Sequence, residues 1–550
     1  MKQKFTNYEL VCYDKNLVGE TPRIRAQAYA PSRFENRYPG CACDVPAHVY
    51  TYSFEPNPDW SSFYANAAEI RKYFEDFAER HDLMPFVKLN TRVISAVWDE
   101  KKGIYNVEVE SNGQRTNDWC HVFVNGTGFL NDWKWPTIEG LHSFEGELLH
   151  SANWDAKTDL TGKKVALIGT GSSAIQMLPR IQKVASHVTS FMRSVTWISP
   201  PIGANVLEEE KENAKACGKA ASQTPQAQYT YTEEQKKRFR EDPQALLRYR
   251  RTLEGSVASL FDMFIAGSET SKGAQQLMKA EMENRIGPGH EDLKARLIPS
   301  WPPGCRRITP GDGYLEALVQ DNVTRVHAEI SKVVPTGIID DQGILHEVDV
   351  IACATGFNLA FTPPFNVCGV NGVSMADEFQ PEPRVYLSVT VPKFPNYFII
   401  NGVRGQWAAG TALPAHEQCV EYILKCAKKI QTEGIKSLEV KEEPITHLYE
   451  HMDSWHRRSV WNADCKSWYK NNEVGGKLWI WGGSALHFLK TLQEPRYEHY
   501  DVQYRTSNMF AYLGNGQTGV EYQAKTAALA GDVHAQLTPY IRIADTPWHI

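Results

Sequence analysis

The sequence of 550 residues lacks several features that would assign it to a special class of protein. No window approaches the roughly 18 uncharged apolar residues of a membrane span, and the N-terminal "MKQKFTNYELV" lacks the apolar core of a signal peptide. The formal net charge is only −6, so neither nucleic acid nor a membrane surface is indicated as a partner. We therefore expect a cytoplasmic globular protein of about two to four domains.

The sequence also offers little that could form a metal site or a disulfide framework. Its eleven cysteines are scattered, only Cys41 and Cys43 lie close together, and no C-x-x-C pair is present. This spacing argues against zinc ribbons, thioredoxin-like redox motifs and a disulfide scaffold. We expect a reducing, intracellular setting and no metal site.

What the sequence does contain is one phosphate-binding turn, in "IGTGSSAIQ" at residues 168–176. It lies between the apolar run 165–168 and an apolar helical pattern. Gly169 and Gly171 allow a tight turn and the close approach of a pyrophosphate, and Ala174 lets the helix pack near its strand. The residues of the turn are Gly169, Thr170, Gly171, Ser172, Ser173 and Ala174. The pattern predicts a dinucleotide site, with a purely structural turn as the alternative.

The end of the following strand indicates which nucleotide this turn binds. An acidic residue there favours NAD, but the strand "HVTSFMRS" ends in Arg193 and Ser194. Because a guanidinium binds a 2′-phosphate in a bidentate manner, NADPH is preferred over NADH. The alternative is that Arg193 is a solvated surface charge.

Short apolar runs and glycine turns predict the surrounding elements. We expect strands within residues 8–13, 92–99, 105–111, 121–128, 163–168, 187–193, 347–357 and 397–400. We expect helices over 66–81 and 415–432, a helical insertion over about 206–297, a loop over 19–34 and an irregular segment over 35–60. The first strand ends at Asp14, which is the place of an acid that contacts a nucleotide ribose.

The segment "FEGELLHSANWD", residues 144–155, has a more specific pattern. On physical grounds alone, a single histidine such as His150 is usually a satisfied linker residue. The segment resembles the F-x-G-x-x-x-H-x-x-x-W-[P/D] fingerprint of Baeyer–Villiger monooxygenases, which are class B flavin monooxygenases. The matching residues are Phe144, Gly146, His150, Trp154 and Asp155.

The resemblance covers most of residues 35–515. "ENRYPGCACDVPAHVYTYSFEPNPDWS" resembles the family's flavin-proximal segment, and "GTGFLNDWKWP" and "CATGF" resemble its two linker turns. "PPGCRRITPGDGYLEAL" resembles the loop that carries its active-site arginine, and "SWYKNNEVGGK" and "FAYLGNG" continue the match. The pattern is similar to that of the filamentous-fungal members associated with secondary metabolism.

The resemblance implies an α/β fold with two dinucleotide-binding, Rossmann-like domains and a helical insertion. The FAD-binding domain would be discontinuous and N-terminally incomplete, with its first part in residues 1–150. The NADPH-binding domain would occupy 151–360. The second part of the FAD-binding domain and the substrate-side region would occupy 361–550.

The resemblance also implies an activity and its cofactors. NADPH would reduce FAD, and the reduced flavin would use O₂ to insert one oxygen atom beside the carbonyl of a small-molecule ketone. The product would be an ester or lactone, from a polyketide or terpenoid intermediate. A flavin monooxygenase that oxygenates nitrogen or sulfur is a second possibility, and the presence of Trp154 and Asp155 argues against it.

Residue roles follow from the same resemblance. Arg307 would be the catalytic arginine, whose fixed charge stabilises negative charge that develops at the flavin and on the substrate. Asp44 would position Arg307, and Arg306 would occupy the adjacent basic position that faces the cofactor. Trp468 would close over the nicotinamide nucleotide. The remaining residues expected at the cofactors are Asp14, Tyr38, Cys43, Gly169, Thr170, Gly171, Ser172, Ser173, Ala174, Arg193 and Ser194.

Less specific roles remain open for three of these residues. Arg306 and Arg307 could form a surface charge pair, and Asp44 could close an Asx turn. His150, on a linker between domains, is expected to couple cofactor binding to domain motion and not to act as a base.

The chain departs from the family pattern near its N-terminus. Members begin with a strand and a G-x-G-x-x-G turn for the FAD pyrophosphate, but no glycine precedes Asp14. The family's Gly-Gly-Thr-Trp is reduced to Gly19, followed by "ETPRIRAQAYAPSRF". Either the sequence is a shortened or mis-spliced form of an active enzyme, or the polypeptide binds FAD weakly or not at all. In the second case it would be an inactive NADP(H)-binding remnant.

Overall fold

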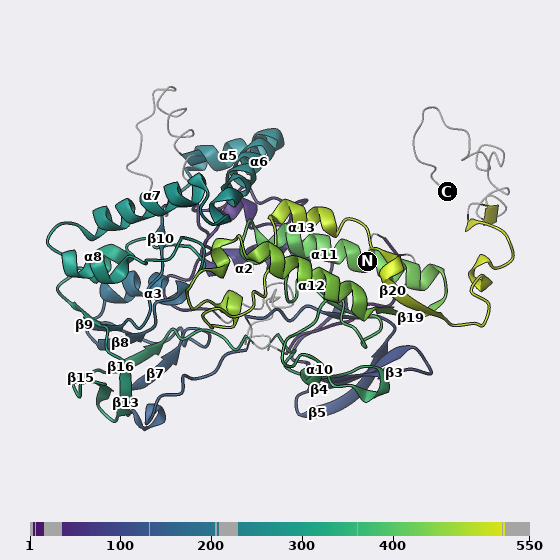
Figure 1. The fold of residues 1–550 in the computed structure, drawn as a ribbon, viewed down its shortest axis with the longest axis horizontal. Coiled ribbons are helices and arrows are strands. Elements are labelled where there is room, and N and C mark those ends of the chain that lie inside the picture. The colour runs from purple at the N-terminus through teal and green to yellow at the C-terminus, as the bar shows by residue number, and fades with distance from the viewer. Residues whose placement is uncertain are drawn as a thin grey trace.

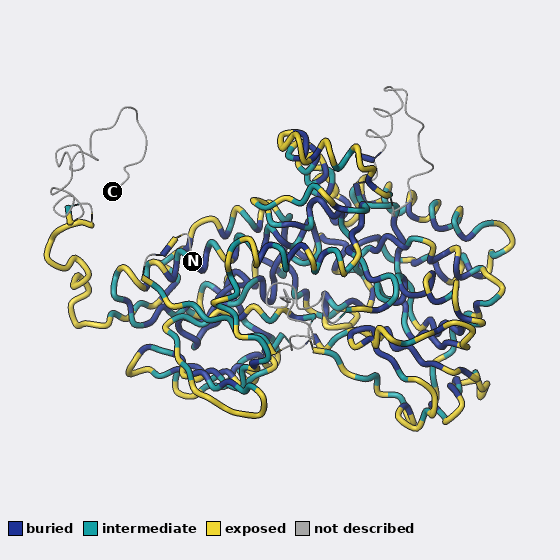
Figure 2. The backbone as a smooth tube through the Cα atoms, turned by 180° about the vertical axis from the view of Figure 1, so that it is seen from behind, coloured by how far each residue is buried: buried dark blue, intermediate teal, exposed yellow. Residues whose placement is uncertain are grey.

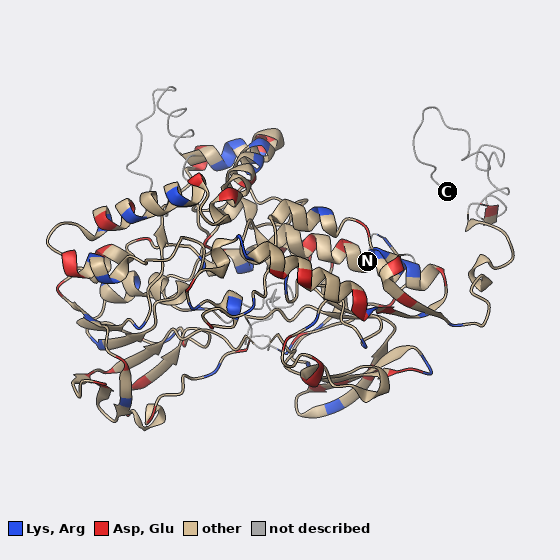
Figure 3. Cartoon of the chain, viewed as in Figure 1, with Lys and Arg blue, Asp and Glu red and all other residues tan. Residues whose placement is uncertain are grey.

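The computed structural model describes most of the chain as an elongated molecule with a sheet toward each end (Figure 1). The described residues are 4–5, 7–15, 36–130, 132–203, 206–207, 229–359, 361–519 and 521–522. The loop expected at 19–34 lies outside them. In the described part of the chain, no helix is long and apolar enough to cross a membrane. Acidic and basic residues are intermingled over both ends in the view of Figure 3.

One end of the molecule is built on a five-stranded parallel sheet with the order β12-β9-β8-β16-β7. Its strands are β7 (Glu147–His150), β8 (Lys164–Ile168), β9 (His187–Phe191), β12 (Val323–Val326) and β16 (Val350–Cys353). The central residues of β8, Val165 to Leu167, have no exposed surface, because parallel strands are covered on both faces. Helix α3 (Ser172–Gln182) follows β8 and packs against α9 (Tyr314–Leu318). The predicted strand–turn–helix unit is present.

The helical segment expected at 206–297 contributes to this same lobe. Its helices are α5 (Glu233–Glu241), α6 (Pro243–Ser259), α7 (Glu269–Ile286) and α8 (Glu291–Leu297). Thr232 begins α5 with a reciprocal capping box, and Asp242 caps α6 ahead of Pro243. Met278, Met282 and Ile286 of α7 lie in one core with β8 and α3. The segment is therefore integrated into the lobe of the five-stranded sheet, and residues 208–228 of it lie outside the described part.

The other end contains a four-stranded sheet and two short parallel pairs. The sheet has the order β17-β3-β4-β5, formed by β3 (Arg92–Asp99), β4 (Ile104–Ser111), β5 (Gln114–Cys120) and β17 (Asn366–Cys368). The parallel pairs are β1 (Cys12–Tyr13) with β2 (Val87–Lys88), and β6 (Phe123–Asn125) with β18 (Tyr397–Ile399). Within the described residues, the parallel pairings of this region, β1–β2, β6–β18 and β17–β3, thus lie in three separate sheets.

Helices cover this second region. Helix α2 (Ala67–Arg80) is capped by Asn66 and buries Ile70, Tyr73, Phe74 and Phe77, as the 66–81 pattern predicted. Helices α11 (Ala412–Thr432), α12 (Glu442–His456) and α13 (Ala485–Thr491) share a core with the antiparallel pair β19 (Ile435–Val440) and β20 (Tyr500–Tyr504). Beyond β20 the chain leaves the body of the molecule, and the residues described there are mostly exposed (Figure 2).

Several small elements were not predicted from the sequence. A three-stranded antiparallel sheet, β13 (Ile330–Val334), β14 (Gly337–Asp340) and β15 (Leu345–Glu347), lies between β12 and β16 in the chain. A short parallel pair joins β10 (Ile198–Ser199) to β11 (Thr309–Pro310), and α10 (Met375–Glu378) follows β17. The β10–β11 pair brings the segment after Arg193 beside the segment that carries Arg306 and Arg307.

Candidate functional site

The predicted phosphate-binding turn has the geometry that a pyrophosphate requires. Gly169 has φ +125°, and a Cβ there would lie 2.5 Å from the carbonyl oxygen of Ala354. At Gly171 a Cβ would meet no atom within 4 Å, so this side of the turn is open. Gly171 caps α3 without a side-chain hydrogen bond, which leaves the first N–H groups of the helix available to an anion. Ala174 is buried where α3 packs on its sheet.

The residues expected at the 2′-phosphate lie together beside this turn. The hydroxyl of Thr170 donates to the carbonyl oxygen of Ser194, and Arg306 Nη1 donates to Ser194 Oγ at 3.0 Å and to the Val195 oxygen at 2.8 Å. Arg193 is exposed. Burial and the nearby charge of Arg193 lower the pKa of Arg306, so the two guanidinium groups are close enough to interact. The end of β9 therefore carries a concentrated positive charge.

Ser172 connects the turn to the loop that follows Arg307. Its Oγ lies 2.8 Å from Thr309 Oγ1, and Thr309 is the first residue of β11. Ser173 is half-buried in the first turn of α3, next to this contact.

Arg307 and Asp44 form a bidentate ion pair across 263 residues of sequence. Arg307 Nε donates to Asp44 Oδ2 at 2.6 Å, and Nη2 donates to Oδ1 at 2.8 Å. The Asp44 carboxylate is the main cause that raises the pKa of Arg307. Buried Tyr469 also interacts with Arg307, and burial raises the pKa of this phenol to about 12. The pair keeps the Arg307 guanidinium charged and holds it in one orientation.

The segment that carries Asp44 is attached to α3 by Gln176, which sequence reasoning did not single out. Gln176 Oε1 accepts from the Tyr38 hydroxyl at 2.8 Å and from the Ala42 N–H at 3.4 Å, while Nε2 donates to the Ala42 oxygen at 3.1 Å. Gly40 has no room for a side chain, because a Cβ would lie 2.4 Å from the backbone carbonyl oxygen of Gln176. Gln176 is the last residue of the motif quoted from the sequence, and its polarity inside an apolar helical pattern was the available signal.

Cys43 and Asp14, which are expected near the flavin, are both held by backbone hydrogen bonds. Cys43 is buried, and its N–H donates to the Ala65 oxygen at 3.0 Å. Asp14 follows β1, where its N–H donates to the Lys88 oxygen at 3.1 Å and its oxygen accepts from the Thr91 N–H at 2.8 Å. Asp14 is half-buried and directly follows the parallel strand β1.

His150 of the fingerprint is fully buried and neutral. Burial lowers its pKa to about 4. Its Nδ1 accepts from the Ala152 N–H at 3.1 Å, so Nε2 carries the proton and donates to Thr355 Oγ1 at 3.3 Å. The ring stacks on Trp133 with centroids 4.5 Å apart. His150 therefore joins the two linker turns near residues 133 and 355, which agrees with a positioning role and not with a base.

The other fingerprint residues are structural in the geometry observed. At Gly146 a Cβ would lie 2.4 Å from the Asp349 oxygen, so only glycine fits beside β16. Phe144 packs against the core between the parallel sheet and the small antiparallel sheet, and Trp154 lies in the core with α3. Asp155 is exposed and its Oδ1 accepts from the Lys157 N–H.

Trp468 begins a short 3-10 helix, Trp468–Lys470, in the C-terminal region. Its ring lies 5.0 Å from that of Phe129 and 4.4 Å from that of Tyr469. Tyr469 interacts with both Arg307 and Asp44. Trp468 is therefore the sequence neighbour of a residue that interacts with the ion pair.

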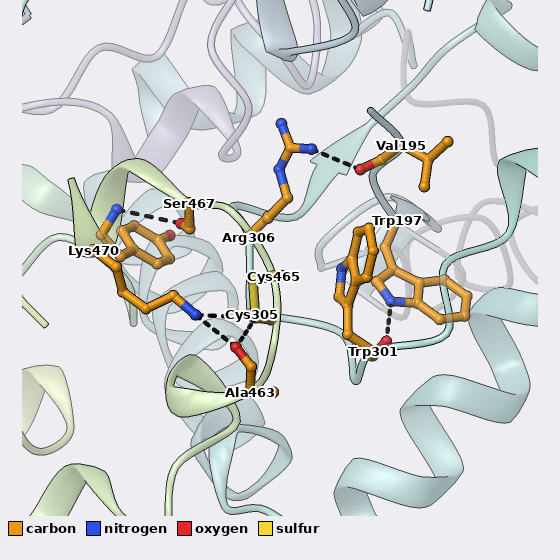
Figure 4. Close-up of a disulfide and its surroundings, with 10 residues drawn as sticks. Val195, Trp197, Trp301, Cys305, Arg306, Ala463, Cys465, Ser467 and Lys470 are labelled. Carbon is orange, nitrogen blue, oxygen red and sulfur yellow. Dashed lines mark hydrogen bonds between the residues drawn. A yellow bond between two sulfur atoms is a disulfide. The ribbon is translucent and has the colours of Figure 1, made fainter. Parts of the chain in front are cut away.

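A disulfide joins Cys305 to Cys465, and the spacing of the cysteines gave no indication of it. It lies between the arginine-bearing turn and the segment before Trp468 (Figure 4). Among the described residues, no group of three histidine, cysteine, aspartate or glutamate side chains is arranged to hold a metal ion.

Comparisons with known proteins agree with this arrangement. The sequence profile of the family described as flavin-binding monooxygenase-like matches residues 38–208. The chain is 37% identical over 490 residues to the FAD-binding monooxygenase tazF of Aspergillus terreus, which covers 88% of this chain and 84% of that protein. The chain belongs to the flavin-binding monooxygenase family. It is also 32% identical over 461 residues to a Baeyer–Villiger monooxygenase of Pseudomonas aeruginosa, covering 82% of this chain and 81% of that one.

Solved structures in the same group share the fold. Cyclohexanone monooxygenase from Rhodococcus sp. Phi1, bound to NADP⁺, superimposes with a TM-score of 0.73 at 22% identity over 90% of this chain and 94% of that one. The complex of OTEMO with FAD and NADP superimposes with a TM-score of 0.72, over 86% and 92% of the two chains. The predictions of a flavin monooxygenase and of a Rossmann-like α/β fold are therefore confirmed.

Proposed function

We propose that this flavin monooxygenase is a Baeyer–Villiger enzyme, which uses FAD, NADPH and O₂ to insert an oxygen atom next to a ketone carbonyl. The observation that carries the proposal is the bidentate Asp44–Arg307 pair, with Nε–Oδ2 and Nη2–Oδ1 distances of 2.6 and 2.8 Å. Such a fixed charge stabilises an anion better than a mobile side chain does, because the protein need not reorganise during the reaction. The fingerprint at residues 144–155 supports the same assignment.

The NADPH half of the proposal rests on the turn before α3. We assign the pyrophosphate to Gly169–Ala174 and the 2′-phosphate to Arg193, Ser194 and Arg306. The N–H groups that begin α3 suit one anion, and the paired guanidinium charges suit the other. Trp468 is assigned to the nicotinamide side, because its segment lies beside the Arg307 ion pair.

The FAD half of the proposal rests on Asp14, Tyr38, Cys43, Asp44 and Arg307. Bound FAD supplies the redox chemistry between NADPH and O₂. Asp14 suits a ribose hydroxyl, because a carboxylate after a parallel strand accepts hydrogen bonds there. Tyr38 and Cys43 shape the segment that ends at Asp44, and Arg307 supplies the positive charge.

The substrate proposal is a small-molecule ketone, with no nucleic-acid or membrane partner, in the cytoplasm. We further propose a polyketide or terpenoid intermediate of secondary metabolism. This is supported by the identity to fungal FAD-binding monooxygenases, including moxY of Dothistroma septosporum, at 32% over 521 residues.

One experiment tests the oxygenation directly. The full chain is incubated with FAD, NADPH and ¹⁸O₂ against a panel of cyclic and aryl ketones, thioethers and tertiary amines, and products are analysed by mass spectrometry. We expect esters or lactones that carry one ¹⁸O atom. Sulfoxides or N-oxides without any ester would instead support the nitrogen- or sulfur-oxygenating alternative.

The visible spectrum of the same protein provides the control for the cofactor. We expect added FAD to be retained after gel filtration and to be bleached by NADPH without O₂. A protein that binds NADPH but retains no FAD would contradict the enzyme proposal and favour the NADP(H)-binding remnant.

A further inference from the structure

The disulfide Cys305–Cys465 joins two segments that both carry residues of the proposed site. The two cysteines are 160 positions apart in sequence, and their exposed fractions are 0% and 2%. Cys305 directly precedes Arg306 and Arg307, and Cys465 lies three residues before Trp468. The bond therefore lies between the groups assigned to the two cofactors.

The arginine-bearing turn is held on its other side by the NADPH lobe. Trp197 Nε1 donates to the Trp301 oxygen at 2.8 Å, and Arg306 Nη1 donates to the Val195 oxygen, on the side of the turn away from Lys470 (Figure 4). At Gly304, with φ +94°, a Cβ would lie 2.7 Å from the ring of Phe264, so the turn is closely packed. These contacts fix the turn to the NADPH lobe, while Arg307 of the turn also interacts with Tyr469 of the C-terminal segment.

The C-terminal segment 463–470 has internal hydrogen bonds, and its Tyr469 oxygen also accepts from the Trp479 N–H at 2.8 Å. Lys470 is fully buried, and its Nζ donates to the Ala463 oxygen at 2.6 Å and lies 3.8 Å from Cys305 Sγ. The Lys470 N–H donates to the Ser467 oxygen at 3.0 Å, and Ser467 Oγ accepts from the Tyr469 N–H at 3.3 Å. These bonds fix the backbone of Trp468 and Tyr469 relative to the rest of the segment.

We propose that the Cys305–Cys465 disulfide is a positioning cross-link that sets the NADPH affinity of the proposed monooxygenase. The bond holds the 463–470 segment against the arginine-bearing turn, so Trp468 and Tyr469 are ordered before NADPH binds. The inference rests on the assignment of this region to NADPH in the proposed function. Without the bond, the segment must be ordered during binding, and that ordering costs binding free energy.

The first measurement establishes the bond in the full-length holoenzyme. Free thiols are alkylated without a reductant, and the digest is searched for a peptide that links residues 305 and 465. A dithiol reductant then converts the disulfide to two thiols and itself becomes a cyclic disulfide. We expect the linked peptide to disappear on reduction and to return on reoxidation with oxidised glutathione.

The second measurement follows NADP⁺ binding by titration calorimetry, which does not require turnover. We expect reduction, Cys305→Ser and Cys465→Ser each to weaken NADP⁺ binding roughly five- to tenfold and to raise KM for NADPH by a similar factor. The turnover number should change much less. The serine variants should no longer respond to the dithiol, and Cys368→Ser, which changes a free cysteine on β17, should behave as the wild type does.

Four outcomes separate the possibilities. Absence of the linked peptide would overturn the proposal, and so would an unchanged NADP⁺ affinity after reduction and in both serine variants. If the serine variants lose secondary structure, the test is the reversible reduction of the wild type. Recovery of NADP⁺ affinity on reoxidation supports the proposal, and an NADP⁺ affinity that reduction does not change contradicts it. Failure to form esters while NADP⁺ affinity still follows the bond would contradict the proposed function alone.

Discussion

The two nucleotide-binding regions of the chain differ in how their parallel strands are joined. Around α3, five parallel strands form one sheet, and Val165, Ala166 and Leu167 of β8 are completely buried. On the side assigned to FAD, the described parallel strands form three separate pairs, β1–β2, β6–β18 and β17–β3, and Val124 of β6 is 44% exposed. The NADPH turn is thus supported by its own sheet, whereas the segment that carries Asp44 depends on contacts with a neighbouring helix.

A substitution in a parallel strand of each region should give the largest difference in the free energy of unfolding. We expect Leu167→Ala in β8 to cost about 2–5 kcal/mol of stability, because a cavity forms in a closed core. Val124→Ala in β6 should cost less than about 0.5 kcal/mol, because the side chain is already partly in water. Urea denaturation followed by circular dichroism measures both changes. Equal costs would show that the two sheets are equally well packed.

Arg307 tests whether the two regions meet in one active site. We expect Arg307→Ala to reduce ester formation by roughly 10²- to 10³-fold, since a fixed charge opposite the developing anion is lost. NADP⁺ affinity and flavin reduction should be nearly unchanged. Arg115→Ala, which removes an exposed ion-paired arginine on β5, is the matched control. Normal ester yield from Arg307→Ala would refute the assigned role.

The two glycines of the phosphate turn should separate folding from binding. Gly169→Ala is expected to cost about 1–3 kcal/mol of stability, because alanine is strained at φ +125° and its Cβ meets the Ala354 oxygen. Gly171→Ala should leave stability unchanged and only weaken NADPH binding, because its Cβ enters the open side of the turn. Thermal melts and NADP⁺ titrations of both variants check the difference. A lower melting temperature for Gly171→Ala would show that the added Cβ meets protein atoms, and would contradict the assignment of this side of the turn to a ligand.

The smallest effect is expected at Arg193. Arg193→Ala should raise KM for NADPH about tenfold, which is the loss of one charge-assisted hydrogen-bonded contact. KM for NADH should not change, because NADH lacks the 2′-phosphate. Initial rates with both coenzymes give the comparison, and an equal rise for both would contradict the assignment.

Local sequence patterns predicted the elements that depend on local chemistry. The apolar spacing of residues 70–77 identified α2, and the glycines at 169 and 171 identified the turn before α3. The Gln176 contact with Ala42 and the disulfide at Cys305 could not be predicted, because each joins segments more than 130 residues apart. Such contacts depend on the three-dimensional arrangement, which periodicity does not encode. The residues of the Asp44–Arg307 pair were found only through the family resemblance.

Through Gln176, helix α3 also holds the segment that carries Asp44. The phosphate site that we propose lies at Gly171, and about 7.5 Å further along the axis of α3 the amide of Gln176 binds both backbone groups of Ala42. We infer that the separation between the proposed nicotinamide and flavin sites is set by the length of one helical segment. Because of these contacts, any displacement of α3 would carry the 38–44 segment with it.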